Sequence, residues 1–398
     1  MTAPATRTPA TGTPTHGRLR AEDCHLEDLR ALLDAGTDLA DYPYAQRVEQ
    51  DVLVYEAATV RDTLAQGGSE PIEAELARAF ADGPGIVVFA GALDAPVVDR
   101  VSAVFSSIIV DQHAAGGPAG DHFGKPGAND RVWNALEKLA VADPDGFVDY
   151  YQNDLLDLAS RSWLGPGYQM TSTVNVVNPG GAAQTVHRDY HLGFMDTDQS
   201  AAYPAHVHAL SPALTLQGAV AHCDMPVETG PTLYLPHSQK YSHGYLAYWL
   251  PEFQEYFGTH HVQLPLRTGD AVFFNPALFH AAGTNRSSDV RRMANLLQVS
   301  SAFGRPMETV DHERLVNAVY PALLARAGDG WTIEALDRVV ANSADGYAFP
   351  TNLDRDQPVD GMAPATQADT VRAALARHAS PAELAEQLAE QRRRSQSH

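Results

Sequence analysis

Three side chains have the types and the spacing of metal ligands among the 17 histidines and many acidic residues of the chain. His187 and Asp189 are separated by one residue, so on an extended strand their side chains project from the same face. His280 lies far along the sequence, after the turn and apolar run that begin at Gly269. Two imidazoles and one carboxylate can grip one iron while leaving positions open for oxygen and a chelating co-substrate. This pattern predicts His187, Asp189 and His280 as metal ligands and as the catalytic centre.

A second His-X-Asp triplet has the same spacing in a different context. His222-Cys223-Asp224 runs directly into the turn-forming stretch that starts at Met225-Pro226. We therefore predict that His222 lies at the end of a strand and that Asp224 belongs to the turn, with no metal at either residue.

Other histidines also need an assignment. His206 and His208 are two residues apart, but they lie in a stretch bounded by prolines, which predicts a loop or a strand edge. His191 follows Asp189 on the same face. Two interpretations stay open for His191: support of a ligand or a substrate, or simple packing.

The elements that must position these ligands are short strands. From about residue 167 to 303, apolar runs alternate with turn residues, without the helices that a parallel sheet needs between its strands. This predicts an antiparallel barrel or sandwich. Polar residues recur on one face of two runs, which indicates a wet barrel interior, although a solvated outer face would show the same pattern. These residues are Thr171, Thr173 and Asn175 in the first run, and Thr215 and Gln217 in the second.

The flanking parts of the chain are predicted from composition. Residues 1–20 are predicted to be a disordered tail, although their composition also resembles a transit peptide. Residues 21–84 are predicted to be helical, residues 85–305 to form the β-rich catalytic domain, and residues 306–398 to form a helical extension. Within that extension, residues 342–362 are dense in Pro, Gly, Asn and Asp, and a loop this long is usually functional or disordered. We expect it to form a lid over the barrel mouth, with a plain linker as the alternative.

Composition excludes several classes of protein. The hydrophobic content of 44% suffices for a sizeable core. A formal net charge of −21 would repel nucleic acid and anionic membranes. Cys24 and Cys223 are too few for a disulfide framework and are expected to be buried, which favours a reducing, cytoplasmic location. We find no apolar run long enough for a membrane helix. The oligomeric state is not predicted.

Three groups of residues, in this order and spacing, resemble one known family. They are His187-Arg188-Asp189-Tyr190-His191, then Glu228-Thr229-Gly230-Pro231-Thr232-Leu233-Tyr234-Leu235-Pro236-His237-Ser238, then Gly269-Asp270 and His280 with Gly283, Asn285, Ser287 and Arg291. The set resembles the phytanoyl-CoA dioxygenase family of iron(II)- and 2-oxoglutarate-dependent oxygenases over about residues 85–303. The resemblance implies a mainly β fold with flanking helices (α+β), built on a double-stranded β-helix, a cupin-like jelly roll. It also implies iron(II), 2-oxoglutarate and O2 as cofactors, with His187, Asp189 and His280 on the iron.

The same resemblance gives Arg291 the role of pairing with the far carboxylate of 2-oxoglutarate. A guanidinium offers paired donors that match a carboxylate, and alternation would put Arg291, Met293 and Asn295 on one strand face. The alternative is that Arg291, or its neighbour Arg292, is a surface charge. Relatives place a hydroxyl two residues after the distal histidine, where this chain has Ala282. Candidates that could assist Arg291 instead are Thr173, Asn175 and Gln217.

The predicted function is oxidation, preferably hydroxylation, of a small organic molecule coupled to decarboxylation of 2-oxoglutarate. Asp189 favours hydroxylation, because halogenating relatives have a small residue there. A polar metabolite or natural-product intermediate is preferred to an acyl-CoA, because we find no obvious basic cluster for the CoA phosphates. Specificity is expected from residues 113–131 and 342–362, which are loops on a rigid scaffold. Two alternatives stay open: a cupin-type metalloenzyme such as an isomerase, and a non-catalytic jelly roll that binds a ligand.

Overall fold

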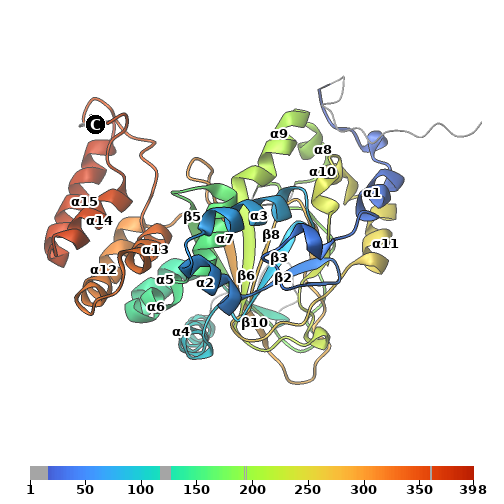
Figure 1. The fold of residues 1–398 in the computed structure, drawn as a ribbon, viewed down its shortest axis with the longest axis horizontal. Coiled ribbons are helices and arrows are strands. Elements are labelled where there is room, and N and C mark those ends of the chain that lie inside the picture. Colours follow the sequence, from blue (N-terminus) through green and yellow to red (C-terminus); the bar gives the residue numbers. More distant parts are fainter. Residues whose placement is uncertain (1–16, 117–126, 192, 194, 359–360) are drawn as a thin grey trace, which may run out of the picture.

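The computed structural model describes residues 17–116, 127–191, 193, 195–358 and 361–398. It shows a mixed α+β fold in which helices surround a large sheet (Figure 1). Most of the predicted disordered tail, residues 1–20, lies outside the described residues. Its last residues do not fit that prediction, because Leu19 is buried and Arg18 forms a bridge with Pro204.

The large sheet has eight strands drawn from most of the chain. In spatial order they are β1 (Arg47–Glu49), β2 (Val52–Glu56), β3 (Ile86–Ala90), β8 (Ala271–Phe274), β6 (Thr215–Ala221), β10 (Arg292–Ser300), β5 (Gln169–Val177) and β4 (Asn129–Val132). β2 and β3 pair in parallel, and all the other neighbours in this sheet are antiparallel. The antiparallel prediction for residues 167–303 is therefore confirmed.

A second, smaller sheet carries one of the predicted ligands, His280. It pairs β7 (Leu233–Leu235) with β9 (Phe279–Ala281). Single bridges add the segment at His187 beside β9 and the segment at Val262 beside β7. Side chains from both sheets line one cavity.

Two strands of the large sheet lie where only helices were predicted. β1 and β2 fall within residues 21–84, and β2 is buried on both faces: Leu53 and Tyr55 belong to the main core, and Val52 and Val54 to a second buried cluster with Tyr234. A strand that is buried on both faces shows a continuous apolar run instead of alternation, so its period gives no signal. The helices expected in this segment do form, as α1 (Leu26–Leu33), α2 (Ala57–Ala65) and α3 (Ser69–Ala81).

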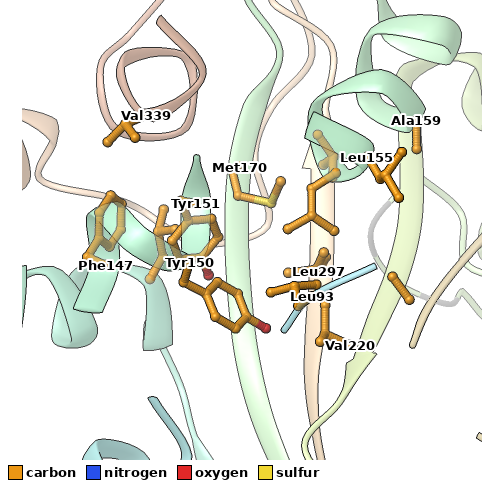
Figure 2. Packing of buried hydrophobic residues seen from close by; sticks show 14 of the residues in the cluster. Leu93, Phe147, Tyr150, Tyr151, Leu155, Ala159, Met170, Val220, Leu297 and Val339 are labelled. Atoms are coloured by element: carbon orange, nitrogen blue, oxygen red, sulfur yellow. The ribbon is translucent and has the colours of Figure 1, made fainter. Parts of the chain in front are cut away.

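Helices cover one face of the large sheet and build the main core. They are α3, α4 (Ala95–Ala114), α5 (Ala135–Ala142), α6 (Pro144–Tyr151) and α7 (Asp154–Leu164). Figure 2 shows Tyr150 and Tyr151 of α6 against Met170 of β5 and Leu297 of β10. This core packs against one face of the large sheet, and the opposite face of the sheet lines the cavity.

The predicted loop at residues 113–131 is only partly a loop. His113 belongs to the last turn of α4, and Asn129–Val132 form strand β4. Residues 117–126, in the middle of this segment, lie outside the described residues.

Four more helices lie between the strands on the side of the smaller sheet: α8 (Thr197–Ala201), α9 (Ala205–Leu210), α10 (Gly244–Ala247) and α11 (Pro251–His260). His206 and His208 lie on α9, so the prediction of a loop or strand edge for them was wrong.

The C-terminal part is helical, as expected, and joins the main core. Its helices are α12 (His312–Gly328), α13 (Ile333–Ser343), α14 (Gln367–Ala376) and α15 (Pro381–Ser395). α12 packs against α5 and α6. In the described part of the chain, we find no helix with the length and apolarity that a membrane crossing requires.

Candidate metal centre

The side chains of His187, Asp189 and His280 converge at the smaller sheet. Their candidate ligand atoms all lie within 4.8 Å of one another. Nε2 of His280 is 3.8 Å from Oδ2 of Asp189. Over the described residues, this is the single cluster of three His, Cys, Asp or Glu side chains able to share an ion. The structure thus brings together the three residues that the spacing predicted.

Backbone hydrogen bonds hold the two ligand segments side by side. The amide of His187 donates to the carbonyl of His280 at 3.0 Å, and the amide of His280 donates to the carbonyl of His187 at 3.1 Å. The amide of Asp189 donates to the carbonyl of Pro276, also at 3.0 Å. The ligand geometry is therefore set by backbone pairing rather than by flexible side chains.

Both imidazoles are oriented for metal binding. Nδ1 of His187 lies 2.9 Å from the carbonyl of Thr185, and Nδ1 of His280 lies 2.8 Å from the carbonyl of Leu278. A carbonyl only accepts, so each Nδ1 carries the hydrogen and each Nε2 keeps its lone pair. Burial and the adjacent His187 lower the pKa of His280 to about 4. His280 is therefore a neutral ligand at physiological pH.

The carboxylate is held by an amide from the large sheet. Gln217 on β6 donates from Nε2 to Oδ2 of Asp189. The same Nε2 lies 3.3 Å from Oε1 of Gln298 on β10. Gln217 therefore links the ligand Asp189 to the large sheet and restricts the rotation of its carboxylate.

A cavity of about 410 Å³ extends from these ligands between the two sheets. Apolar side chains, among them Val88, Val272 and Phe274, form much of its wall. Two buried amide oxygens, Oδ1 of Asn175 and Oε1 of Gln217, have no hydrogen-bond partner among the described residues. A buried acceptor without a partner is costly, so these atoms point to a ligand that donates to them. Asn175 and Gln217 lie where the sequence predicted.

The structure places Arg292, and not the predicted Arg291, at the cavity. Arg291 lies outside the cavity, with a side chain that is 57% exposed and pairs with Asp130 at 3.0 Å. Arg292, by contrast, is buried and lines the cavity together with Ala294 on the same face of β10. The predicted strand face was therefore wrong: Met293 belongs to the opposite face, in the main core.

The reason is a polar residue buried on the core side. Asn295 shares its face with Met293, and its Nδ2 donates to the hydroxyls of Tyr150 and Tyr151, each at 3.3 Å. Both faces of β10 thus mix polar and apolar residues, and alternation cannot tell which face is inside. Burial lowers the pKa of the Arg292 guanidinium to about 10, so it is still a cation at neutral pH.

Thr173 is already engaged by another side chain. Its hydroxyl lies 3.4 Å from Oε1 of Glu308, and Thr173 does not contribute to the lining of the cavity. Glu308 also accepts from the amide of Asn134 at 2.6 Å. Thr173 therefore fixes the segment that follows β10 and has no free donor toward the metal centre.

The remaining histidines are held by other contacts. His222 directly follows β6 and is buried behind the sheet, where its ring bonds the hydroxyls of Ser102 and Tyr150. His191 has both ring nitrogens occupied, by the hydroxyl of Thr215 and the carbonyl of Arg305. These contacts favour packing over a role at the metal.

Three cavity residues were missed in the sequence. Arg131 and Trp133 line the cavity, and the guanidinium lies 5.0 Å from the indole ring. Gln298 lines it from β10. The alternation of Arg131 and Trp133 at the end of β4 is the signal that could have found these two residues.

Comparisons with known proteins agree with this geometry. The sequence model of the phytanoyl-CoA dioxygenase (PhyH) family matches residues 81–293. No curated protein matches the chain.

Several solved structures are similar to part of this chain at low identity. They include the non-heme alpha ketoglutarate dependent epimerase SnoN from nogalamycin biosynthesis, 21% identical over 58% of this chain and 84% of that one, with a TM-score of 0.37. The carbocyclase SnoK from the same biosynthesis is 20% identical over 60% and 86%, with a TM-score of 0.39. HygX from Streptomyces hygroscopicus, solved with nickel, 2-oxoglutarate and hygromycin B, is 15% identical over 60% and 90%, with a TM-score of 0.41.

Proposed function

The chain belongs to the phytanoyl-CoA dioxygenase family, and on that premise we propose that it is an iron(II)- and 2-oxoglutarate-dependent oxygenase that hydroxylates, or otherwise oxidises, a small organic molecule. The observation that carries the proposal is the convergence of His187, Asp189 and His280 at a cavity that also receives a buried arginine, Arg292. The cofactor set of iron(II), 2-oxoglutarate and O2 agrees with both the family and the triad.

The residues present fit these cofactors. His187 and His280 would bind iron through Nε2 and Asp189 through a carboxylate oxygen, because both Nδ1 atoms are already committed. Arg292 would pair with the distal carboxylate of 2-oxoglutarate, since its guanidinium is buried and, among the described residues, makes only two long contacts of 3.4 Å, to the carbonyls of Thr229 and Gly283. When bound, iron and 2-oxoglutarate supply the oxidising chemistry.

The residues of the protein contribute to the reaction by positioning the bound groups and by excluding water. Gln217 fixes the carboxylate of Asp189. The apolar walls of the cavity keep the site dry, which strengthens the charge pairing of Arg292. The amide oxygen of Asn175 has no partner of its own and would accept a hydrogen bond from the bound co-substrate or substrate.

We propose that the core is a double-stranded β-helix. The two sheets enclose the cavity, and ligands come from the smaller sheet and its bridged neighbour at His187. We assign the antiparallel part of the large sheet as one wall of that core. The N-terminal strands β1 and β2 extend this wall.

The experiment that tests the function is anaerobic addition of iron(II) and 2-oxoglutarate to the metal-free protein. We expect the weak visible charge-transfer band of an iron–2-oxoacid chelate. Alanine at His187, Asp189 or His280 should abolish the band, whereas His222→Gln should keep it. A cupin-type metalloenzyme would bind iron without the band, and a non-catalytic ligand-binding protein would bind no iron.

For the substrate we propose a polar small molecule, such as a natural-product intermediate, in preference to an acyl-CoA. The polar atoms of Asn175, Gln217 and Gln298 face a cavity whose walls are otherwise largely apolar. This arrangement fits a compact ligand with a few hydrogen-bonding groups.

We also propose that residues 342–362 act as a lid. The segment begins within α13, and its Tyr347 makes ring contacts with Phe349 at 5.9 Å and with Phe303 at 6.5 Å. Phe303 is in the loop that also carries Met307, a residue that lines the cavity. This places exposed aromatic residues beside a loop that reaches the site.

Limited proteolysis checks the lid. Cutting within residues 344–358 should slow at least several-fold when iron, 2-oxoglutarate and substrate are bound, because closure would bury the segment. Cutting within residues 34–41, most of which are exposed, should keep its rate and serves as the control. Equal rates within the segment, with and without ligands, would identify it as a linker.

A further inference from the structure

A second cavity, of about 420 Å³, lies among α9, α10 and the short turn, residues 211–214, that precedes β6. Every ionisable side chain in its wall that can carry a charge at neutral pH is basic, and no Asp or Glu is among the described residues that line it. This is unexpected in a chain with 49 acidic and only 28 basic residues. The basic residues are Arg188, Lys240, His206, His208 and His243.

Arg188 is the most buried of these cations. Its side chain is 2% exposed, and no carboxylate pairs with it among the residues described. Nη2 donates to the carbonyl of Ser238, while Nε is buried without an acceptor. The guanidinium lies over the rings of Tyr245 and Phe279, at 5.3 and 5.0 Å. Aromatic faces attract the cation but leave its N–H donors unused.

The backbone makes room for this guanidinium at one glycine. A Cβ on Gly244 would lie 1.9 Å from Cζ of Arg188, so any other residue there would displace the side chain. The guanidinium is thereby held in a fixed orientation at the cavity. A buried cation with an unused donor is expensive unless an anion meets it.

Lys240 supplies a second positive charge. Its Nζ lies 2.8 Å from Nδ1 of His237 and 3.2 Å from the carbonyl of Asp82, and it makes no ion pair with a described carboxylate. Two cations in one cavity repel each other unless an anion lies between them.

We propose that this second cavity binds a small oxyanion, the carboxylate or phosphate group of a metabolite, between Arg188 and Lys240. An oxyanion matches the planar donors of a guanidinium, and the ammonium adds a point charge. Apolar and aromatic wall residues such as Trp163 and Tyr241 would contact the rest of the ligand. Arg188 stands between the proposed ligands His187 and Asp189, so an anion here would hold the segment that carries them.

The test is calorimetric titration of the full-length, metal-free protein with sodium phosphate, sulfate and acetate. Saturable binding is expected, and the ranking separates the two ligand classes: tighter phosphate and sulfate indicate a phosphate-bearing ligand, and comparable acetate indicates a carboxylate. The Arg292→Gln protein should bind equally well. Loss of binding in Arg292→Gln would instead place the anion in the metal cavity and overturn the proposal. Because no metal is present, the result does not depend on the proposed reaction.

Matched variants locate the anion. Ala209 is an exposed residue of α9 that lines this cavity. Ala209→Glu adds a competing negative charge and should weaken binding on the order of tenfold or more, whereas the isosteric Ala209→Gln should change it by less than about threefold. Lys240→Gln should weaken binding on the order of tenfold, and Lys138→Gln, which removes the same charge elsewhere, should not. No saturable binding, or equal affinity in Ala209→Glu and Ala209→Gln, would refute the site.

Discussion

Arg291 and Arg292 are consecutive cations in opposite environments, and this difference can be measured. Arg292 lines the metal cavity and is buried. Losing one partner of a buried charge pair costs about 2 to 5 kcal/mol. Arg292→Gln should therefore weaken 2-oxoglutarate binding by roughly 30- to 3,000-fold. Iron binding depends on other side chains and should stay nearly intact. Binding constants from anaerobic titration measure both effects.

The neighbouring residue provides the control. Arg291 lies outside the cavity with a side chain that is 57% exposed, and it pairs with Asp130, whose buried carboxylate also contacts His113 and Asn178. Arg291→Gln should therefore leave 2-oxoglutarate binding almost unchanged. If only Arg291→Gln weakens it, the strand face assigned here is wrong.

Gln217 is a positioning residue rather than a ligand. It donates to the carboxylate of Asp189, and loss of such supporting hydrogen bonds typically lowers metal affinity by about 10- to 100-fold. We expect this loss of iron affinity in Gln217→Leu, measured by competition with a chelator. Asn175→Leu removes another cavity amide, one that makes no bond to Asp189, and should keep iron affinity within about threefold. Equal losses in the two variants would show a general effect of cavity polarity.

At the scale of elements, a buried polar network ties helix α6 to the back of the sheet. His222 after β6 bonds the hydroxyl of Tyr150 at 2.9 Å and that of Ser102 on α4 at 2.8 Å. Asn295 of β10 joins the same network through Tyr150. Complete burial lowers the pKa of His222 to about 3, so the folded protein holds this ring in its neutral form.

This network makes stability depend on pH in a defined direction. The unfolded chain takes up a proton at His222 near pH 6.5, whereas the folded protein does so only near pH 3. The stabilisation is full above pH 6.5 and is lost as the pH falls, at up to about 1.4 kcal/mol per pH unit. In His222→Gln the free energy of unfolding should therefore fall less steeply between pH 6.5 and 5, as measured by urea denaturation.

Tyr150→Phe is the control for this slope. It removes a hydrogen bond from the network but no titrating group, so it should lower stability by about 1 kcal/mol at every pH while keeping the slope. A His222→Gln slope equal to that of the unmodified protein would mean that the ring is already charged in the folded state.

Some elements can be predicted from the sequence and others cannot, for physical reasons. The candidate ligands could be found because the one-residue spacing of His187 and Asp189 on an extended segment, and a turn before the strand that carries His280, leave a local pattern. β2 could not, because Val52–Tyr55 are buried on both faces and show no period. The inward face of β10 could not, because Nδ2 of the buried Asn295 donates to tyrosines from a helix far away in the sequence. Only packing against α6 distinguishes Arg292 from Arg291.

At the scale of the whole molecule, the chain outside the family match is part of the same core. Val316, Tyr320 and Leu323 of α12 belong to one buried cluster with Leu297 of β10 and Val220 of β6. The boundary predicted at residues 305/306 therefore does not separate two hydrophobic cores. A shared core predicts cooperative unfolding of the helical extension together with the sheet that holds the metal centre.

Leu323→Ala tests this coupling. Leu323 is fully buried on α12, so its truncation should lower the free energy of unfolding by about 2 to 5 kcal/mol, whereas Ile333→Ala, at a side chain 80% exposed, should change it by less than about 0.5 kcal/mol. In Leu323→Ala, circular dichroism of the helices and release of bound iron should still follow one transition with a single, lower midpoint. An extension that folds on its own would give two transitions, with iron released at the midpoint of the unmodified protein. Iron release is the decisive measurement, because the candidate ligands lie in the smaller sheet and in the segment bridged to it, away from α12, and only a common core could connect the two.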